Sequence, residues 1–260
     1  MGPAEAVAIF GAGTAAGAVN AVVGSGSLIT FPTLLAFGYP PVVANVSNNV
    51  GLVSGNISGA IGYRRELSGQ RTRLIRLGVL AAAGSIGGAA ALLLLPSSSF
   101  QVIVPALILI ACVLVLIQPW LSARIIAGRA RQAGTGGAED SRREHTGPVL
   151  GGGVLASAAY GGYFGAAQGV LVIGLLGAFL DETMQRVNGG KNVLVGIVNG
   201  TAALVYIVFA HVAWLVVLLI AAGSTIGGLI GARFGRKLPP LALRIFVVLI
   251  GVVSALKLLL

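Results

Sequence analysis

The sequence predicts an all-α integral membrane protein built from two inverted-topology repeats. The composition is too apolar for a soluble protein, because 56% of the 260 residues are hydrophobic and only 9% are charged, against about 25% charged residues in a typical soluble domain. Several apolar segments have the length of a membrane span. Residues in the first half of the chain also recur at a constant offset in the second half.

The same composition argues against other classes of protein. The 40 glycines follow no period; in an apolar chain they allow close helix packing and broken helices. Long apolar runs exclude an outer-membrane barrel, whose strands alternate apolar and polar residues. A net charge of +10 would suggest nucleic acid as the partner of a soluble protein. Here the basic residues cluster in loops, so they indicate membrane topology and attraction to anionic lipid headgroups, and no nucleic acid is expected.

Each repeat is expected to contain a broken-helix hairpin and three transmembrane helices, giving eight or more helical segments in total. Six segments have the roughly 20 apolar residues that a span needs, namely 41–63, 74–95, 98–121, 187–208, 212–232 and 239–260. Two further apolar stretches, 5–38 and 148–180, are interrupted by glycine. The interruptions are Gly24-Ser25-Gly26-Ser27 in the first, and Gly161-Gly162 and Gly165 to Gly169 in the second. The N-terminus lacks the basic region of a cleaved signal peptide.

An offset of 143 residues relates the two halves without a gap from about residue 20 to residue 96. Asparagine is the informative residue, because six of the eight asparagines pair at this offset: Asn45 with Asn188, Asn49 with Asn192, and Asn56 with Asn199. Such a recurrence indicates an internal repeat. The predicted organisation is a first transmembrane repeat over 1–121, a basic cytoplasmic linker over 122–147 and a second transmembrane repeat over 148–260.

The distribution of positive charge predicts that equivalent loops of the two halves lie on opposite sides of the membrane. Of the 17 basic residues, 13 lie in the segments 64–76, 122–147 and 233–237, and the repeat-mates of the first and last segments carry none. The positive-inside rule places all three segments in the cytoplasm. Each half then crosses the membrane an odd number of times, with both termini outside. A hairpin that returns to its starting side and a hairpin of two full spans both satisfy this parity.

Each glycine-rich break is expected to place the start of a helix inside the membrane. The first is Gly24-Ser25-Gly26-Ser27, and the second is Ala167-Gln168-Gly169. A helix start exposes up to four unpaired N–H groups and the positive end of the helix dipole. Two such ends meeting near the midplane would form an anion site, with Ser25, Ser27 and Gln168 as further donors. The alternative is a glycine-rich kink that serves helix packing.

Asparagines are expected to line a substrate cavity beside these helix starts. Asn45, Asn49 and Asn56 lie within about 60° on one helical face, since an α-helix turns about 100° per residue, and their repeat-mates reproduce that face. Those nearest the helix starts are assigned to the cavity: Asn45, Asn48, Asn49, Asn188 and Asn192. For Asn56 and Asn199, a structural role in hydrogen bonds between helices is as well supported as a place in the cavity.

Lys191 takes the position of Asn48 in the second repeat, several residues inside a span. A charge at that depth costs about 3 kcal/mol or more and usually marks function. The alternative is that the side chain snorkels toward the interface. If the charge is buried, the groups that could compensate it are a bound anion, water and the carbonyl ends of broken helices. We therefore include Lys191 in the predicted anion site.

The sequence offers no chemistry for an enzyme, cofactor or metal site. All seven carboxylates lie outside the spans or at their ends, which argues against a cation pore. Cys112 is the only cysteine, so the chain has no intrachain disulfide, and His145 and His211 lie far apart. The stretch Gly11-Ala12-Gly13-Thr14-Ala15-Ala16 fits a dinucleotide fingerprint, but no acidic residue follows at the required spacing. Helix packing is the better explanation of that stretch.

Three motifs resemble the TauE/SafE family of permeases. They are Gly24-Ser25-Gly26-Ser27-Leu28-Ile29-Thr30-Phe31-Pro32-Thr33-Leu34, Ala44-Asn45-Val46-Ser47-Asn48-Asn49 and Gly84-Ser85-Ile86-Gly87-Gly88. The resemblance covers nearly the whole chain, although Leu175 takes the place of Pro32 in the second repeat. It implies a permease of the bacterial cytoplasmic (inner) membrane, in a family linked to export of sulfite and organosulfonates.

Together these observations predict a secondary permease that moves a small anion through the lipid bilayer by alternating access around a midplane site. A membrane-embedded binding or scaffold subunit and an anion channel are the alternatives. The sequence leaves open the identity of the anion, the direction of transport, the coupling ion and the oligomeric state.

Overall fold

The structure is a computed structural model that describes residues 1–133, 147–234 and 240–259. The described residues form helices and contain no strand, as the sequence predicts. The helices are α1 (Pro3–Val22), α2 (Ser27–Ala36), α3 (Pro41–Gly62), α4 (Arg71–Leu94), α5 (Ser97–Ala133), α6 (Pro148–Tyr163), α7 (Gln168–Phe179), α8 (Met184–Phe209), α9 (Trp214–Phe234) and α10 (Pro240–Leu259).

Five described helical segments are long and apolar enough to cross a membrane: α1, α4, residues Ser97–Trp120 of α5, α8 and α9. The α3 helix has comparable length, with 22 residues, but its four asparagines lower its hydropathy. Those asparagines are all buried. The α2 and α7 helices have 10 and 12 residues. At 1.5 Å per residue each covers only about half of a hydrocarbon core about 30 Å thick.

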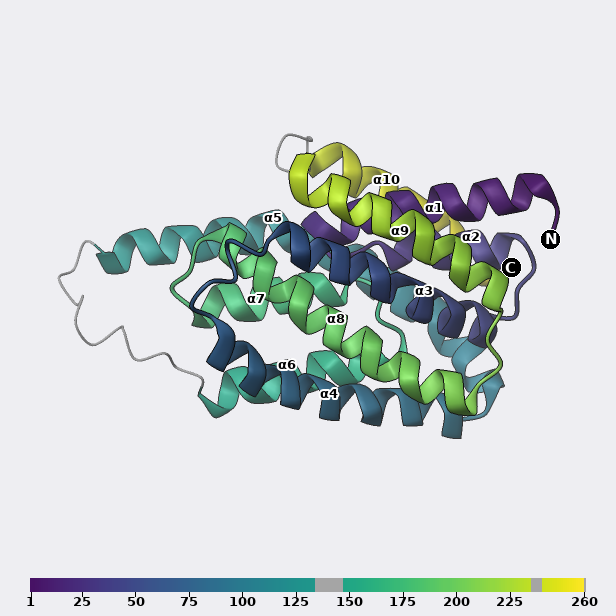
Figure 1. Ribbon diagram of the computed structural model, residues 1–260, viewed down its shortest axis with the longest axis horizontal. Coiled ribbons are helices and arrows are strands. Elements are labelled where there is room, and N and C mark those ends of the chain that lie inside the picture. The colour runs from purple at the N-terminus through teal and green to yellow at the C-terminus, as the bar shows by residue number, and fades with distance from the viewer. Residues whose placement is uncertain (134–146, 235–239, 260) are drawn as a thin grey trace.

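The helices run along the long axis of the molecule, and both termini lie at the same end (Figure 1). The hairpin of α1 and α2 begins and ends at this end, whereas the hairpin of α6 and α7 begins and ends at the opposite end (Figure 1). The connection between α3 and α4, which carries Arg64 and Arg65, also lies at the end opposite the termini, as does the C-terminal end of α5 (Figure 1). We call this end of the molecule the basic end.

The two halves of the chain interlock instead of packing as separate units. The α1 helix packs chiefly on α9, and α6 packs on α4; α3 contacts both α8 and α9. The pairs α2 with α10 and α7 with α5 are likewise counterparts. This pattern of helix pairs is compatible with a two-fold repeat in which each hairpin is held by helices of the other half.

Glycines create the closest of these helix contacts. A side chain at Gly227 of α9 would collide with the carbonyl oxygen of Thr14 in α1, and one at Gly88 of α4 would collide with that of Ala159 in α6. A Cβ atom at Gly13 would lie 3.0 Å from the Cα atom of Ile220. The small residues of the stretch 11–16 therefore pack against α9, in agreement with the packing interpretation of the dinucleotide-like motif.

The structure departs from the expected elements in two places. The α5 helix continues to Ala133, through the first part of the segment 122–147 that was predicted to be a linker. Alanine and arginine, both strong helix formers, recur there and no proline interrupts them. Residues 134–146 lie outside the described residues. Gly161 and Gly162, predicted to belong to the second break, lie inside α6, which ends at Tyr163.

Candidate functional site

The chain leaves helical geometry twice within the hairpins, between α1 and α2 and between α6 and α7. In the first break Gly24 has φ +85°, and in the second Gly165 has φ +78°. These left-handed conformations favour glycine because a Cβ atom is disfavoured there. Ala167, with φ 57°, is the one described non-glycine residue with positive φ. The local sequence thus explains where each helix is interrupted.

The two breaks are in direct contact with each other. The N–H of Gly169 donates to the carbonyl oxygen of Gly24 over 3.1 Å. A Cβ atom on either glycine would lie only 2.5 Å from the Cα atom of the other. Backbones can approach this closely only where both residues lack a side chain. The starts of α2 and α7 therefore lie beside one another, as the predicted anion site requires.

Lys191 of α8 binds the C-terminal end of α1 at the first break. Its Nζ atom donates to the carbonyl oxygens of Asn20 over 2.6 Å and Ala21 over 3.1 Å, and the side chain is fully buried. The amide of Asn192 also donates to Ala21 over 3.3 Å. The last carbonyls of a helix lack intrahelical partners and form the negative end of its dipole. The lysine charge is thus placed where helix geometry favours a cation.

Asn20 also belongs to this site, although the sequence pattern did not predict it. Its Oδ1 atom accepts a hydrogen bond from the N–H of Gly26 over 2.7 Å, so it satisfies one donor at the start of α2. It is 8% exposed. An asparagine within an apolar helix could have indicated a role for this residue. The repeat pattern did not, because the residue 143 positions later is not an asparagine.

The second break is held by neutral side chains. The amide of Asn45 in α3 donates to the carbonyl oxygen of Tyr163 over 3.0 Å. The hydroxyl of Tyr160 donates to the carbonyl of Ala166 over 2.6 Å, and that of Tyr206 donates to the carbonyl of Gly162. The two tyrosines were not predicted as site residues. Asn45 of α3 thus supports the hairpin of the other half, whereas Tyr160 and Tyr206 support the hairpin of their own half.

Two predicted site residues at the breaks themselves carry buried polar atoms without a hydrogen-bond partner among the described residues. The hydroxyl of Ser25 lies just before α2, and the side-chain amide of Gln168 begins α7; both residues are 1% exposed. A buried polar group without a partner costs about 1–3 kcal/mol. At the starts of α2 and α7, these groups are available to bind water or a ligand.

The remaining predicted residues differ in their hydrogen-bond partners. Asn48 accepts a hydrogen bond from Thr30 of α2. Asn49 donates to Asn199 over 3.4 Å, which connects α3 to α8 and supports the structural interpretation of Asn199. Asn188 is on α8 and its Oδ1 atom is buried without a partner among the described residues. Ser27 is the first residue of α2.

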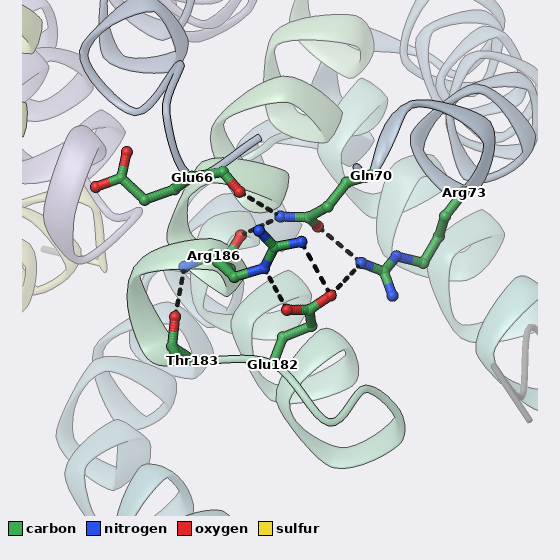
Figure 2. Close-up of polar contacts among 6 residues, drawn as sticks. All are labelled: Glu66, Gln70, Arg73, Glu182, Thr183 and Arg186. Atoms are coloured by element: carbon green, nitrogen blue, oxygen red, sulfur yellow. Dashed lines mark hydrogen bonds and ion pairs between the residues drawn. The ribbon is translucent and has the colours of Figure 1, made fainter. Parts of the chain in front are cut away.

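A charged network connects the two halves at the basic end. Glu182, between α7 and α8, accepts hydrogen bonds from Arg73 of α4 over 2.7 Å and from Arg186 of α8 (Figure 2). Gln70 accepts from Arg73 over 3.0 Å and donates to the backbone of Arg186 over 3.4 Å (Figure 2). Burial alone would raise the pKa of Glu182, but the hydrogen bonds and charges of the two arginines outweigh it and lower the pKa. Glu182 therefore stays ionised and ties α4 to α8.

Broken helices that meet inside an apolar helical bundle recur in membrane transporters. Residues 9–258 match the family described as "Sulfite exporter TauE/SafE". The chain belongs to this family, as the three motifs indicated, and it is a membrane transporter.

Curated relatives agree with this assignment. The "Probable membrane transporter protein YfcA" of Escherichia coli (strain K12) is 25% identical over 255 residues, which cover 94% of this chain and 86% of the relative. The "Probable membrane transporter protein ORF9" of Sinorhizobium sp is 24% identical over 266 residues, covering 96% and 91%. A "Probable membrane transporter protein" of Haemophilus influenzae is 22% identical over 227 residues, covering 86% and 83%. No solved structure matches the chain.

Proposed function

We propose that this transporter is a secondary permease that exports a small anion, sulfite or an organosulfonate, by alternating access around the paired breaks. The observation that carries the proposal is the pair of buried groups of Ser25 and Gln168, which have no partner among the described residues and lie at the starts of two contacting half-helices. A helix start offers N–H groups and a positive dipole end to an anion. Two of them related by a repeat are a recurring substrate site in transporters.

The charge inventory supports an anion as substrate. Lys191 brings a positive charge beside the first break, and the four carboxylates among the described residues, Glu5, Glu66, Asp181 and Glu182, lie in loops or at helix ends. The family description adds sulfite as the substrate class to test first. Sulfite and sulfonates present several oxygen acceptors, which match a hydroxyl, an amide and backbone N–H donors. No small molecule is predicted to be needed as a cofactor.

Export is also the direction that the membrane potential favours. An inside-negative potential helps an anion to leave by about 2.3 kcal/mol per charge per 100 mV. That free energy corresponds to a concentration ratio of about fifty, because about 1.4 kcal/mol is a factor of ten. A uniporter could therefore export an anion without a coupled ion.

We further propose that the basic end faces the cytoplasm and that residues 1–121 and 148–260 are inverted repeats. Positive loops are retained on the cytoplasmic side of bacterial membranes. Two spans have basic residues at one end: α4 begins with several arginines, and α9 has Arg233 in its last turn. In this orientation the network around Glu182 would close the cytoplasmic side of the pathway and open when α4 separates from α8.

The direct test combines anion binding with flux. Purified protein is heated with sulfite, sulfoacetate or chloride, because a ligand of the folded state raises its stability in a concentration-dependent way. The same anions are then followed in proteoliposomes. We expect Ser25→Ala and Gln168→Leu each to weaken binding of the transported anion by about 10-fold or more, since a hydrogen bond to a charged group contributes about 1.5–3 kcal/mol. The thermal stability of both variants without anion should stay constant or rise, because each loses a buried polar group that has no partner in the described part of the chain.

Ser157→Ala is the matched control, because its hydroxyl is also buried without a partner among the described residues but lies in the middle of α6. It should bind and transport like the unmodified protein. If the Ser25, Gln168 and Ser157 variants all bound the anion with equal affinity, the anion site would not lie at the breaks. Absence of any anion flux would favour the scaffold alternative, and flux that neither saturates nor shows counterflow would favour the channel.

A further inference from the structure

Two adjoining grooves lie between α3, α4 and α8. One has a volume of about 510 Å³ and the other about 440 Å³. Both are lined by Leu67, Val193 and Ile197, so they form one continuous depression. Gly78 in α4 and Gly196 in α8 contribute no side chain to it, which explains why the surface is hollowed there. We call this depression the α3–α4–α8 groove.

The groove is apolar along the helices and positively charged at one end. Ile57 and Ile61 of α3 and Ile75 and Val79 of α4 line it and are each more than half exposed. Arg64, just after α3, and Arg71, the first residue of α4, line it at the basic end. Both arginines are exposed. Within the described part of the chain, neither guanidinium has an ion-pair partner.

The dimensions correspond to one leaflet of a bilayer. Arg71 and Ala82, both on α4, line the same groove and are eleven residues apart. That separation is about 16 Å at 1.5 Å per residue. One leaflet contributes half of a hydrocarbon core about 30 Å thick. A lipid whose headgroup is at the arginines would therefore have its acyl chain along the full length of the groove.

We propose that the α3–α4–α8 groove is a binding site for an anionic phospholipid of the leaflet at the basic end. The phosphate would bind between Arg64 and Arg71, and an acyl chain would lie over Gly78 and Gly196. Guanidinium groups bind phosphate through two parallel hydrogen bonds, which are stronger than bonds between neutral groups. An acyl chain in an apolar depression makes more contacts than one on a flat surface. The depression therefore favours a lipid that stays bound over lipids that exchange freely.

This lipid would contact the helix that holds the first break. Asn192 lines the groove and donates to the carbonyl of Ala21, next to Lys191. An acyl chain packed against this part of α8 would limit its movement relative to α3 and α4. Bound anionic lipid should therefore raise the thermal stability of the transporter, whichever anion it moves.

The test uses the full chain purified in a neutral detergent. Phosphatidylglycerol and phosphatidylcholine with identical acyl chains are added, and bound lipid is measured by native mass spectrometry alongside the melting temperature. We expect at least roughly tenfold preference for phosphatidylglycerol in the unmodified protein, the scale of one charge-assisted hydrogen bond. The double variant Arg64→Gln/Arg71→Gln should lose that preference and the associated rise in melting temperature.

The control is Arg65→Gln/Arg76→Gln, which removes the same charge from exposed arginines of the same segment that do not line the groove. It should retain the preference. An equal loss in both double variants would show diffuse attraction to a basic surface and overturn the site. Ala82→Phe, which fills the apolar end of the groove, should weaken binding of both lipids; unchanged binding would overturn the role of the groove.

Discussion

Both hairpins are interrupted at left-handed residues, yet only the first break is supported by a charge. At the first break, Lys191 and Asn192 bind the carbonyls that end α1. At the second, Asn45 and the hydroxyls of Tyr160 and Tyr206 bind carbonyls near the end of α6. A neutral set of donors is therefore sufficient to stabilise such a break.

That difference bears on the function of Lys191. A buried ammonium group costs more than a buried amide, so hydrogen bonding to carbonyls alone does not explain why a lysine takes the position of Asn48. An electrostatic contribution to a nearby anion is the explanation that the proposed function supplies. Three further predictions test how far the two breaks are equivalent.

The largest effect is expected where the breaks touch. Gly24→Ala would place a Cβ atom 2.5 Å from the Cα atom of Gly169 and would also retain an unfavourable φ of +85°. Overpacking costs about 1–3 kcal/mol and a left-handed alanine about 1–2 kcal/mol, so we expect a loss of about 2–5 kcal/mol in stability. Thermal unfolding in detergent measures it, with transport as a second readout.

Two glycines separate these contributions. Gly38 has the same φ of +85° but open space around its Cα atom, so Gly38→Ala should show only the conformational cost. Gly169→Ala meets Gly24 at 2.5 Å without a positive φ and should show mainly the steric cost. If Gly24→Ala were as mild as Gly38→Ala, the direct contact between the breaks would be refuted.

An intermediate effect is expected at the charged position. Lys191→Met should abolish anion binding while leaving thermal stability unchanged or raised, because removing a buried charge offsets the loss of its two hydrogen bonds to carbonyls. Asn48→Ala, at the repeat-mate, should weaken anion binding less, since a neutral amide binds an anion less strongly than an ammonium group does. Anion titrations and melting curves of both variants test this. Unmodified affinity in Lys191→Met would restrict the lysine to a structural role.

The smallest effects are expected from the neutral support of the second break. Tyr160→Phe and Tyr206→Phe each remove one hydrogen bond to a backbone carbonyl and should cost about 1 kcal/mol of stability. Tyr163→Phe is the control, because its hydroxyl is buried without a partner among the described residues, and it should be neutral. Melting temperatures of the three variants decide the matter; a neutral Tyr160→Phe would mean that its hydroxyl does not stabilise the break.

Several features of the site could be predicted because they depend on local sequence. Glycine marks the positions where the chain leaves helical geometry, and both breaks lie where the glycine-rich stretches indicated, apart from Gly161 and Gly162. Lys191 and the asparagines stand out because polar residues are rare in apolar segments. Asn20, Tyr160 and Tyr206 were not selected because a single polar group in a helix gives no indication of the backbone atom it will reach.

By itself the sequence determined the class of the protein, the places where its helices break and the family to which it belongs, because apolar composition, glycine content and motif spacing are properties of short segments. Only the tertiary structure decided that α1 packs on α9 and α6 on α4, and that Lys191 binds a carbonyl 171 residues away. The physical reason is that hydrophobicity does not discriminate between helices inside a membrane. Close backbone approach and satisfied polar groups decide which helices pack together, and both depend on the complete arrangement.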